Sequence, residues 1–84
     1  MTIKAGMKYQ TRNGRMVNIH ALAGSEVNGD GDAIPDHGVG VLLPPNGDVG
    51  QGEGDRWSLS GAYKNGTLGV PHAFDLVHEA GRIE

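Results

Sequence analysis

The feature that most constrains this chain is an Asn-Gly pair between two alternating segments near its N-terminus. Asn13-Gly14 lies between two extended segments, an arrangement that is a strong signal for a β-hairpin. A two-residue loop would mix apolar and polar side chains on each face, whereas a three-residue loop over 12–14 keeps one face apolar. The three-residue loop pairs Met7 with Ile19, Tyr9 with Val17 and Ala5 with Ala21.

Gly14 is the residue that such a loop requires at its end. A three-residue hairpin loop is a type I turn closed by a residue in the left-handed region, where glycine has no Cβ penalty. We therefore predict a bulged hairpin with a positive φ at Gly14. Asn-Gly recurs at 28–29, 46–47 and 65–66, which is typical of a string of hairpins.

Length and composition favour one small β domain spanning residues 1–84. A chain of 84 residues has room for one small core. Its fifteen glycines, more than twice the usual share of ~7 per cent, lie between short apolar runs. The chain has no cysteine, which excludes disulfides, thiolate chemistry and cysteine-ligated zinc. No stretch of helical length has helical periodicity, so turn-rich β structure is expected.

A further strand is predicted over residues 37–43. The segment alternates, with Val39, Val41 and Leu43 on one face and glycines on the other. Glycine in a strand marks a place where another backbone or a large side chain packs closely, and we expect such a contact here.

Two more segments complete the predicted sheet. Residues 56–60 alternate, with Trp57 and Leu59 inward, and turn into a second short hairpin over 62–64. Residues 72–78 fit a closing strand or one helical turn, and we prefer the strand.

These strands predict an all-β fold, a small SH3-like barrel of about five short antiparallel strands. Long Gly-rich loops are expected at 24–36 and 47–55. An OB-like barrel is the alternative, but its usual helix has no candidate in this sequence. The predicted core consists of Tyr9, Val17, Ile19, Val39, Val41, Trp57, Leu59, Phe74 and Leu76.

The sharpest local motif is an acidic loop with oxygen-bearing side chains at alternating positions. Such side chains can converge on one hard cation, and intervening glycines allow the tight wrap of a Ca²⁺ loop. The candidate ligands are Asn28, Asp30, Asp32 and Asp36. The stretch resembles the acidic repeat of thrombospondin type 3, but Asn28 replaces the first acid and Ala33 replaces a glycine. A solvated turn is therefore preferred, and a Ca²⁺-stabilised domain is the alternative.

No constellation in the sequence predicts catalysis. There is no cysteine and no Gly-x-Ser-x-Gly elbow, and paired carboxylates occur only in loops that solvent reaches. The spacings of the four histidines match no common zinc signature. We therefore expect a non-enzymatic protein without a cofactor, apart from the Ca²⁺ alternative.

The charge distribution argues against nucleic acid as the main partner. The formal net charge is -3, and no Lys or Arg lies between Arg15 and Arg56, so no broad phosphate-binding surface is expected. Tyr9 and Trp57, the rings on which bases could stack, are predicted to point inward. Binding of single-stranded nucleic acid is therefore only a second alternative. The chain has neither the apolar run of a signal peptide nor a membrane-spanning stretch, which predicts a cytoplasmic protein without a membrane partner.

Charged side chains at the tip of the first hairpin and around the Gly-rich loop are the predicted partner contacts. Loops carry function more often than the elements that they connect. These candidate binding residues are Arg12, Arg15, Asp48, Glu53, Asp55 and Arg56.

Four short motifs together resemble a group of small phage and prophage proteins. They are Tyr9-x-Thr11-Arg12-Asn13-Gly14, Gly38-Val39-Gly40-Val41, Trp57-x-x-x-Gly61-x-Tyr63 and Asp75-Leu76-Val77. The resemblance covers roughly residues 9–77, and implies a β fold, a bacteriophage source and no catalytic residues. Relative to that group, the loops at 24–36 and 47–55 look enlarged.

Two hypotheses from different classes follow. The preferred one is a non-enzymatic binding module that acts inside an infected bacterium on a host protein, such as a defence component, or sequesters a small signalling molecule. The other is a structural or interaction domain that holds Ca²⁺ in the acidic loop. Exposed sheet edges also leave open a homodimer formed by strand pairing.

Overall fold

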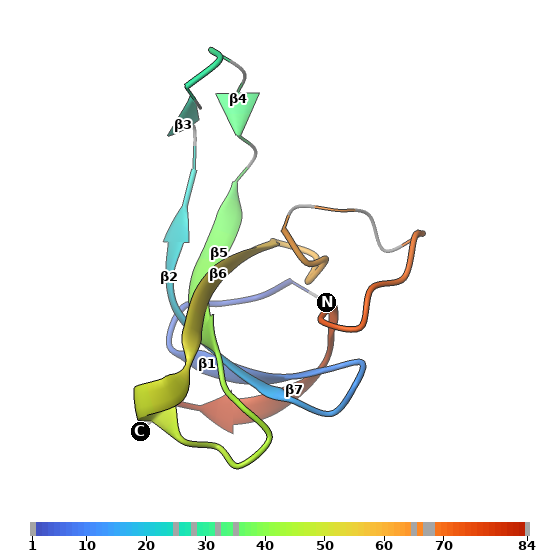
Figure 1. Cartoon of the computed structure of the whole chain (residues 1–84). Helices are drawn as coiled ribbons and strands as arrows, with labels where there is room; N and C mark the ends of the chain where they lie inside the picture. Colours follow the sequence, from blue (N-terminus) through green and yellow to red (C-terminus); the bar gives the residue numbers. More distant parts are fainter. Residues whose placement is uncertain are drawn as a thin grey trace.

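Five antiparallel strands form one sheet in the order β6-β5-β2-β1-β7 (Figure 1). The computed structural model describes residues 2–24, 26–27, 29–31, 33–34, 36–64, 66 and 69–83. The strands of the sheet are β1 (Met7–Thr11), β2 (Met16–Ala23), β5 (His37–Leu42), β6 (Glu53–Ser58) and β7 (Leu76–Arg82). Two short strands, β3 (Glu26–Val27) and β4 (Ala33–Ile34), pair only with each other, and a 3-10 helix, η1, spans Val49–Gln51.

The predicted first hairpin is confirmed. β1 pairs with β2 in the expected register, Met7 with Ile19 and Tyr9 with Val17. Gly14 has φ +87°, and its N–H donates to the carbonyl of Thr11 at 2.9 Å. These contacts close a bulged three-residue loop, because the left-handed residue lets the chain rejoin the ladder.

The predicted pairing of Ala5 with Ala21 is wrong. The chain turns at Ala5 and Gly6, where Gly6 has φ +82°, so β1 begins only at Met7. On the other strand, a register shift after Ile19 carries Ala21 into the ladder with β5. The alternation of the hairpin therefore extends less far than the sequence suggests.

The glycine face of β5, not the valine face, lies against the core. Gly38 and Gly40 are buried, whereas Val39 is 41% exposed and Val41 is half-buried, so the prediction of both valines as core residues is wrong. A Cβ at Gly38 would collide with Cδ1 of Ile3. Large side chains therefore pack onto the strand where glycine leaves room, which is the close contact that the sequence predicts.

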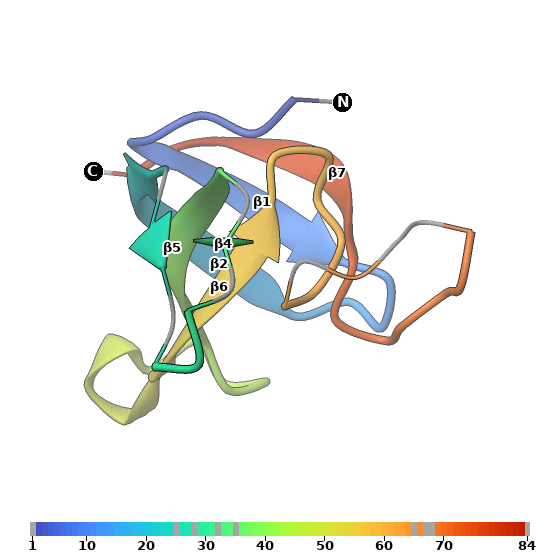
Figure 2. The same cartoon turned by 90° about the horizontal axis from the view of Figure 1, so that it is seen from above.

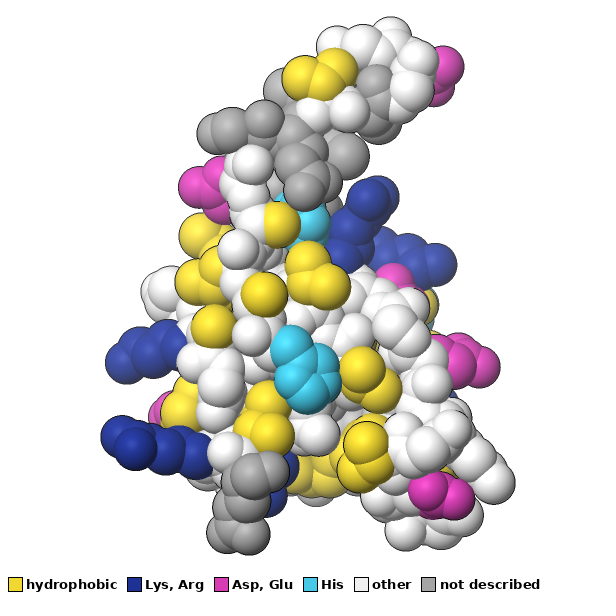
Figure 3. Space-filling view, turned by 90° about the vertical axis from the view of Figure 1, so that its left-hand side faces the viewer, with side chains coloured by type: hydrophobic (Ala, Val, Ile, Leu, Met, Phe, Trp, Pro, Cys, Tyr) yellow, Lys and Arg dark blue, Asp and Glu magenta, His cyan; other side chains and the backbone are white. Residues whose placement is uncertain are grey.

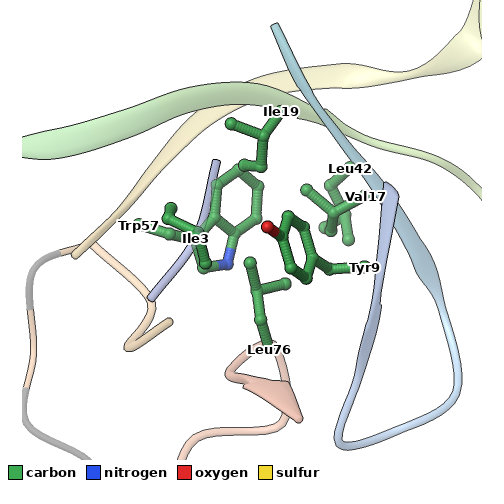
Figure 4. Packing of buried hydrophobic residues seen from close by; sticks show 7 residues of the cluster. All are labelled: Ile3, Tyr9, Val17, Ile19, Leu42, Trp57 and Leu76. Carbon is green, nitrogen blue, oxygen red and sulfur yellow. The ribbon is translucent and has the colours of Figure 1, made fainter. Parts of the chain in front are cut away.

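The remaining core prediction is largely confirmed. Tyr9, Val17, Ile19, Trp57 and Leu76 are buried, and Leu59 and Phe74 pack against them from partly exposed positions. Ile3 and Leu42 complete the central cluster, whose side chains converge from the surrounding strands (Figure 4). The indole N–H of Trp57 donates to the carbonyl of Phe74 at 2.9 Å, so this buried donor is satisfied.

The segment 47–55 is a loop only in its first part. Pro45 and Asn46 turn the chain, η1 follows, and β6 begins at Glu53. Gly54 pairs with Val41 in the ladder with β5, so glycine-rich composition did not prevent backbone pairing at this sheet edge. The prediction of a loop as far as Asp55 is therefore wrong.

The closing strand starts later than the predicted range 72–78. Residues 73 and 74 form a turn in which the Asp75 N–H donates to the carbonyl of His72, and β7 begins at Leu76. A strand is confirmed for the second half of the range, and neither a strand nor a helical turn extends over the whole of it.

The ends of the sheet approach each other through the second hairpin, which is confirmed. Ser58 N–H donates to Ala62 at 2.8 Å, and Leu76 N–H donates across to the carbonyl of Gly61 at 2.8 Å. Figures 1 and 2 show the sheet coiled around the core, with the β3–β4 pair standing out from one end. The fold is all-β and is that of a small SH3-like barrel whose sheet stays open between β6 and β7 along most of their length.

The radius of gyration, 12.3 Å, is close to the roughly 12 Å expected for one compact domain of this length. Within the described part of the chain, no helix is long and apolar enough to cross a membrane.

Candidate functional site

Three aromatic side chains meet at the surface beside the tip of the first hairpin. We call Tyr63, His72 and Phe74 the ring cluster. Tyr63 stacks on His72 with ring centroids 4.6 Å apart, and meets Phe74 edge-on at 5.3 Å. His72 is exposed, whereas Tyr63 and Phe74 are half-buried and pack against the core, so the cluster covers the core and still offers ring surface to a ligand.

Two cationic side chains lie over these rings. The guanidinium of Arg15 is 5.2 Å from the centre of Phe74, and Nζ of Lys64 is 5.3 Å from the centre of Tyr63. Nε of Arg15 also donates to the carbonyl of Leu43 at 2.9 Å, which fixes the side chain. A cation over a ring face is attracted by the ring quadrupole but keeps its full charge.

Asp75 holds together the segments that carry the rings. Asp75 is 1% exposed, and its carboxylate accepts the N–H groups of Tyr63 and His72, each at 2.9 Å. Its carbonyl accepts the N–H of Arg12 at 2.9 Å, and Nη2 of Arg12 lies 3.6 Å from the carboxylate. One buried residue thereby joins the first hairpin, the second hairpin and the loop before β7, which lie side by side in Figures 1 and 2.

Tyr63 also connects the ring cluster to β6. Its hydroxyl donates to the carboxylate of Asp55, whose other oxygen accepts the N–H of Arg56 at 3.0 Å. Burial, helped by the hydrogen bond and the negative charge of Asp55, raises the pKa of Tyr63 to about 12. Next to this contact, Asp55, Arg56 and Lys64 line a shallow cavity of about 330 Å³.

The structure brings four of the six predicted partner residues to the border of the ring cluster. Arg12 and Arg15 reach it from the first hairpin, and Asp55 and Arg56 from β6. Asp48 instead caps η1 by accepting the N–H of Gly50 at 3.0 Å. Glu53 lies at the start of β6, opposite Leu42, and its negative charge contributes to the raised pKa of Tyr63.

The rings themselves are absent from the sequence-based site. Phe74 is predicted as core and His72 as a surface histidine, and no local pattern links either of them to Tyr63. Their meeting depends on the bond from Leu76 N–H to Gly61 and on the carboxylate of Asp75. Such long-range pairings leave no periodic signal in a single sequence.

The predicted Ca²⁺ ligands are only partly described, since Asn28 and Asp32 lie outside the described residues. Asp30 lies in the turn between β3 and β4, whereas Asp36 lies at the base of this pair, with its carboxylate against Gly24. The two described candidates are therefore at opposite ends of the β3–β4 arm. Among the described residues, no group of three or more His, Asp or Glu side chains could hold a metal ion.

Exposed apolar side chains also occur outside the ring cluster in the described part of the chain. Leu22, Val27 and Val39 are 49%, 65% and 41% exposed. On the face shown in Figure 3, hydrophobic atoms occur in small groups separated by polar and backbone atoms. The ring cluster is therefore the better candidate for a binding surface.

Comparison with known proteins gives no relative. No protein-family model matches the chain, and neither a curated protein nor a solved structure matches it.

Proposed function

We propose that this chain is a non-enzymatic binding module that engages its partner through the ring cluster and the cations around it. The observation that carries the proposal is the surface cluster in which Tyr63 stacks on His72 and meets Phe74 edge-on, held in place by the buried carboxylate of Asp75. Rigid rings offer large contact areas at a small entropic cost, which is why aromatic residues and arginine are enriched at binding hot spots.

The chemistry of the same groups supports binding over catalysis. With its pKa raised to about 12, Tyr63 keeps its proton near neutral pH and is a poor nucleophile or base. The Asp75 carboxylate is occupied by two backbone N–H groups, and Nδ1 of His72 accepts the N–H of Phe74 at 3.0 Å. These hydrogen bonds position the surface, engage both oxygens of the buried Asp75 carboxylate and occupy the Nδ1 lone pair of His72.

The resemblance of residues 9–77 to small phage and prophage proteins supports a partner inside an infected bacterium. The partner would be a host protein, such as a defence component, or a small signalling molecule, and the site of action would be the cytoplasm. This part of the proposal rests on analogy with those proteins. The fold does not supply it, because one fold can have many functions.

The test is affinity capture from bacterial lysate with a matched pair of histidine variants. His72→Ala removes the exposed ring of the cluster, whereas His20→Ala removes an exposed ring from β2, outside the cluster. We expect a component captured by the wild type to be retained by His20→Ala and lost with His72→Ala. Equal capture by both variants, or turnover of the captured component, would overturn the proposal.

A further inference from the structure

Charge is segregated along the chain, and the fold concentrates part of it at the ring cluster. All seven Lys and Arg residues lie outside residues 16–55, and seven of the ten acidic residues lie within that range. Four of the seven basic residues border the ring cluster, and we call them the cationic rim. They are Arg12, Arg15, Arg56 and Lys64. An acidic chain thus presents a locally basic surface.

Two carboxylates at the rim, those of Asp75 and Asp55, are engaged by the scaffold, and the negative charge of Glu53 also acts on Tyr63. Asp75 is buried and accepts two backbone N–H groups, and its ion pair involves Arg12 alone. Asp55 accepts from the Tyr63 hydroxyl and from the N–H of Arg56. Arg15 and Lys64 lie over ring faces instead, which orients both cations without neutralising them.

We infer that the ring cluster and its cationic rim recognise an acidic segment of a partner protein, with one or two carboxylates on Arg15 and Lys64 and a flat side chain on His72. This inference rests on the proposed function and names the chemistry of the partner. A bidentate carboxylate suits the guanidinium of Arg15, whose Nε donates to Leu43 and whose outer nitrogens have no hydrogen-bond partner among the described residues.

The number of cations favours a short acidic segment over a nucleic acid. Binding to a phosphate backbone needs several free cations in a row, whereas here Arg12 already faces Asp75. The net charge of -3 repels a long polyanion but has less effect on a peptide that brings two carboxylates to one place.

The test is a titration of the ¹⁵N-labelled protein, followed by NMR, with two capped peptides, Glu-Glu-Trp-Glu-Glu and its neutral counterpart Gln-Gln-Trp-Gln-Gln. We expect the acidic peptide to bind about tenfold more tightly, because each exposed ion pair is worth up to about fivefold in affinity. The amide signals of Arg15, Tyr63, Lys64 and Phe74 should shift, and 0.5 M salt should remove most of the difference.

Variants assign the contacts. Arg15→Gln and Lys64→Gln should each weaken the acidic peptide about two- to fivefold, since each removes one ion pair. Lys4→Gln, which removes an exposed cation outside the rim, should leave its affinity unchanged. The indole N–H signal of Trp57 reports folding of each variant, because this group bonds to Phe74 beneath the ring cluster.

Other results would overturn the inference in distinguishable ways. If both peptides bound equally tightly and shifted the signals of the ring cluster, recognition of carboxylates would be contradicted. The ring cluster would still be supported as a binding surface. Tighter binding of adenosine monophosphate or a short oligothymidine at the same residues would point to a nucleoside phosphate. Shifts that depend on protein concentration alone would identify a second copy as the source of the acidic segment. No shift at the ring cluster with any probe would count against the surface itself.

Discussion

Gly38 and Gly40 lie on the core-facing side of β5, where the space that a Cβ would fill is already occupied. At Gly38 the neighbour is the end of the Ile3 side chain, which can move. At Gly40 the neighbours are the carbonyl oxygen of Asn18 and, at 2.9 Å, Cδ1 of Ile19. Neither glycine has a positive φ, so the requirement at both positions is lack of volume, not backbone freedom.

Alanine substitutions separate these two situations. We expect Gly40→Ala to lower the free energy of unfolding by about 2–3 kcal/mol, because a backbone atom cannot yield, and Gly38→Ala by about 1 kcal/mol. Gly54→Ala is the control, since nothing lies within 4 Å of its Cβ position and its φ is not positive. Its effect should lie within about 0.5 kcal/mol of zero. Urea unfolding followed by Trp57 fluorescence measures all three, and equal losses would contradict the argument.

Tyr63 predicts a stability change at alkaline pH. Its pKa is near 10.0 in an unfolded chain and is raised to about 12 in the fold, so the folded state holds the proton more tightly. The stabilisation is complete below pH 10 and is lost as the pH rises through 12. We therefore expect the stability of the wild type relative to Tyr63→Phe to be constant up to that range and then to fall.

Absorbance titration near 295 nm checks the cause of this shift. Asp55→Asn should lower the pKa of Tyr63 towards its ordinary value, because it removes the negative charge and weakens the hydrogen bond that hold the proton. Tyr63→Phe identifies the signal of Tyr9 in the same titration. A pKa of Tyr63 that does not respond to Asp55→Asn would assign the shift to burial and to the negative charge of Glu53.

The elements differ in how far their sequence determines them. The register of the β1–β2 hairpin follows from Asn13-Gly14 and from alternation on both sides, because only one loop length keeps the apolar residues together. In β5 the alternation of valine and glycine predicts a strand. It does not predict which face is buried, since valines and glycines both fit a buried surface. That choice is made by Ile3 and Ile19, which approach the strand from elsewhere in the chain.

The loop before β7 is organised by a single carboxylate. Asp75→Asn replaces one acceptor oxygen by an NH₂ group, which would face the N–H of Tyr63 or of His72, and it removes the charge opposite Arg12. We expect a loss of about 2 kcal/mol in the free energy of unfolding, because one buried donor is left unsatisfied. Glu79→Gln, at an exposed position of β7, is the matched control and should change little. Thermal unfolding distinguishes the two, and comparable losses would remove the special role of Asp75.

The β3–β4 arm is predicted to be dispensable for the barrel. Its pairs, such as Glu26 with Ile34, continue the register of Ala23 with His37, and these strands pair only with each other. Replacing residues 25–35 by Asn-Gly would close β2 onto β5 with a two-residue turn. The free energy of unfolding should then change by less than about 1 kcal/mol. A larger loss would show that the arm supports the barrel.

The full chain should also melt at the same temperature with and without millimolar Ca²⁺, because Asp30 and Asp36 lie at opposite ends of the arm. A Ca²⁺-dependent rise in melting temperature that disappears when the arm is removed would restore the acidic loop as an ion site.

At the scale of the whole molecule, the fold class is far easier to predict than the binding surface. Short alternating runs between glycine turns favour a small barrel because few other arrangements hide so many strand edges. The ring cluster instead joins Tyr63 to His72 and Phe74 across the seam of the sheet, through contacts between distant parts of the chain. Part of the charged border was predicted because charge near loops is visible in a sequence, but Lys64 and the convergence of the rings were not predicted.

The sheet edges decide whether two copies can pair through their strands. Along β6, residues 62–64 already bond to the outer side of Arg56 and Ser58, and Asp55 covers the N–H of Arg56. Along β7, the register with β1 skips Val77 and Ala80, so this edge carries two bulges. Bulges and occupied edges are the devices by which natural sheets discourage strand addition.

We therefore expect the chain to be a monomer at ~100 μM, a concentration at which strand-paired dimers of millimolar affinity stay dissociated. Sedimentation equilibrium should return the monomer mass of 8.8 kDa at low and at high salt. Dimerisation that persists in high salt would assign the homodimer to strand pairing, because backbone hydrogen bonds are not screened as charges are. Dimerisation only at low salt would instead indicate an ionic contact. The cationic rim of one copy could then bind the acidic residues within 16–55 of the other.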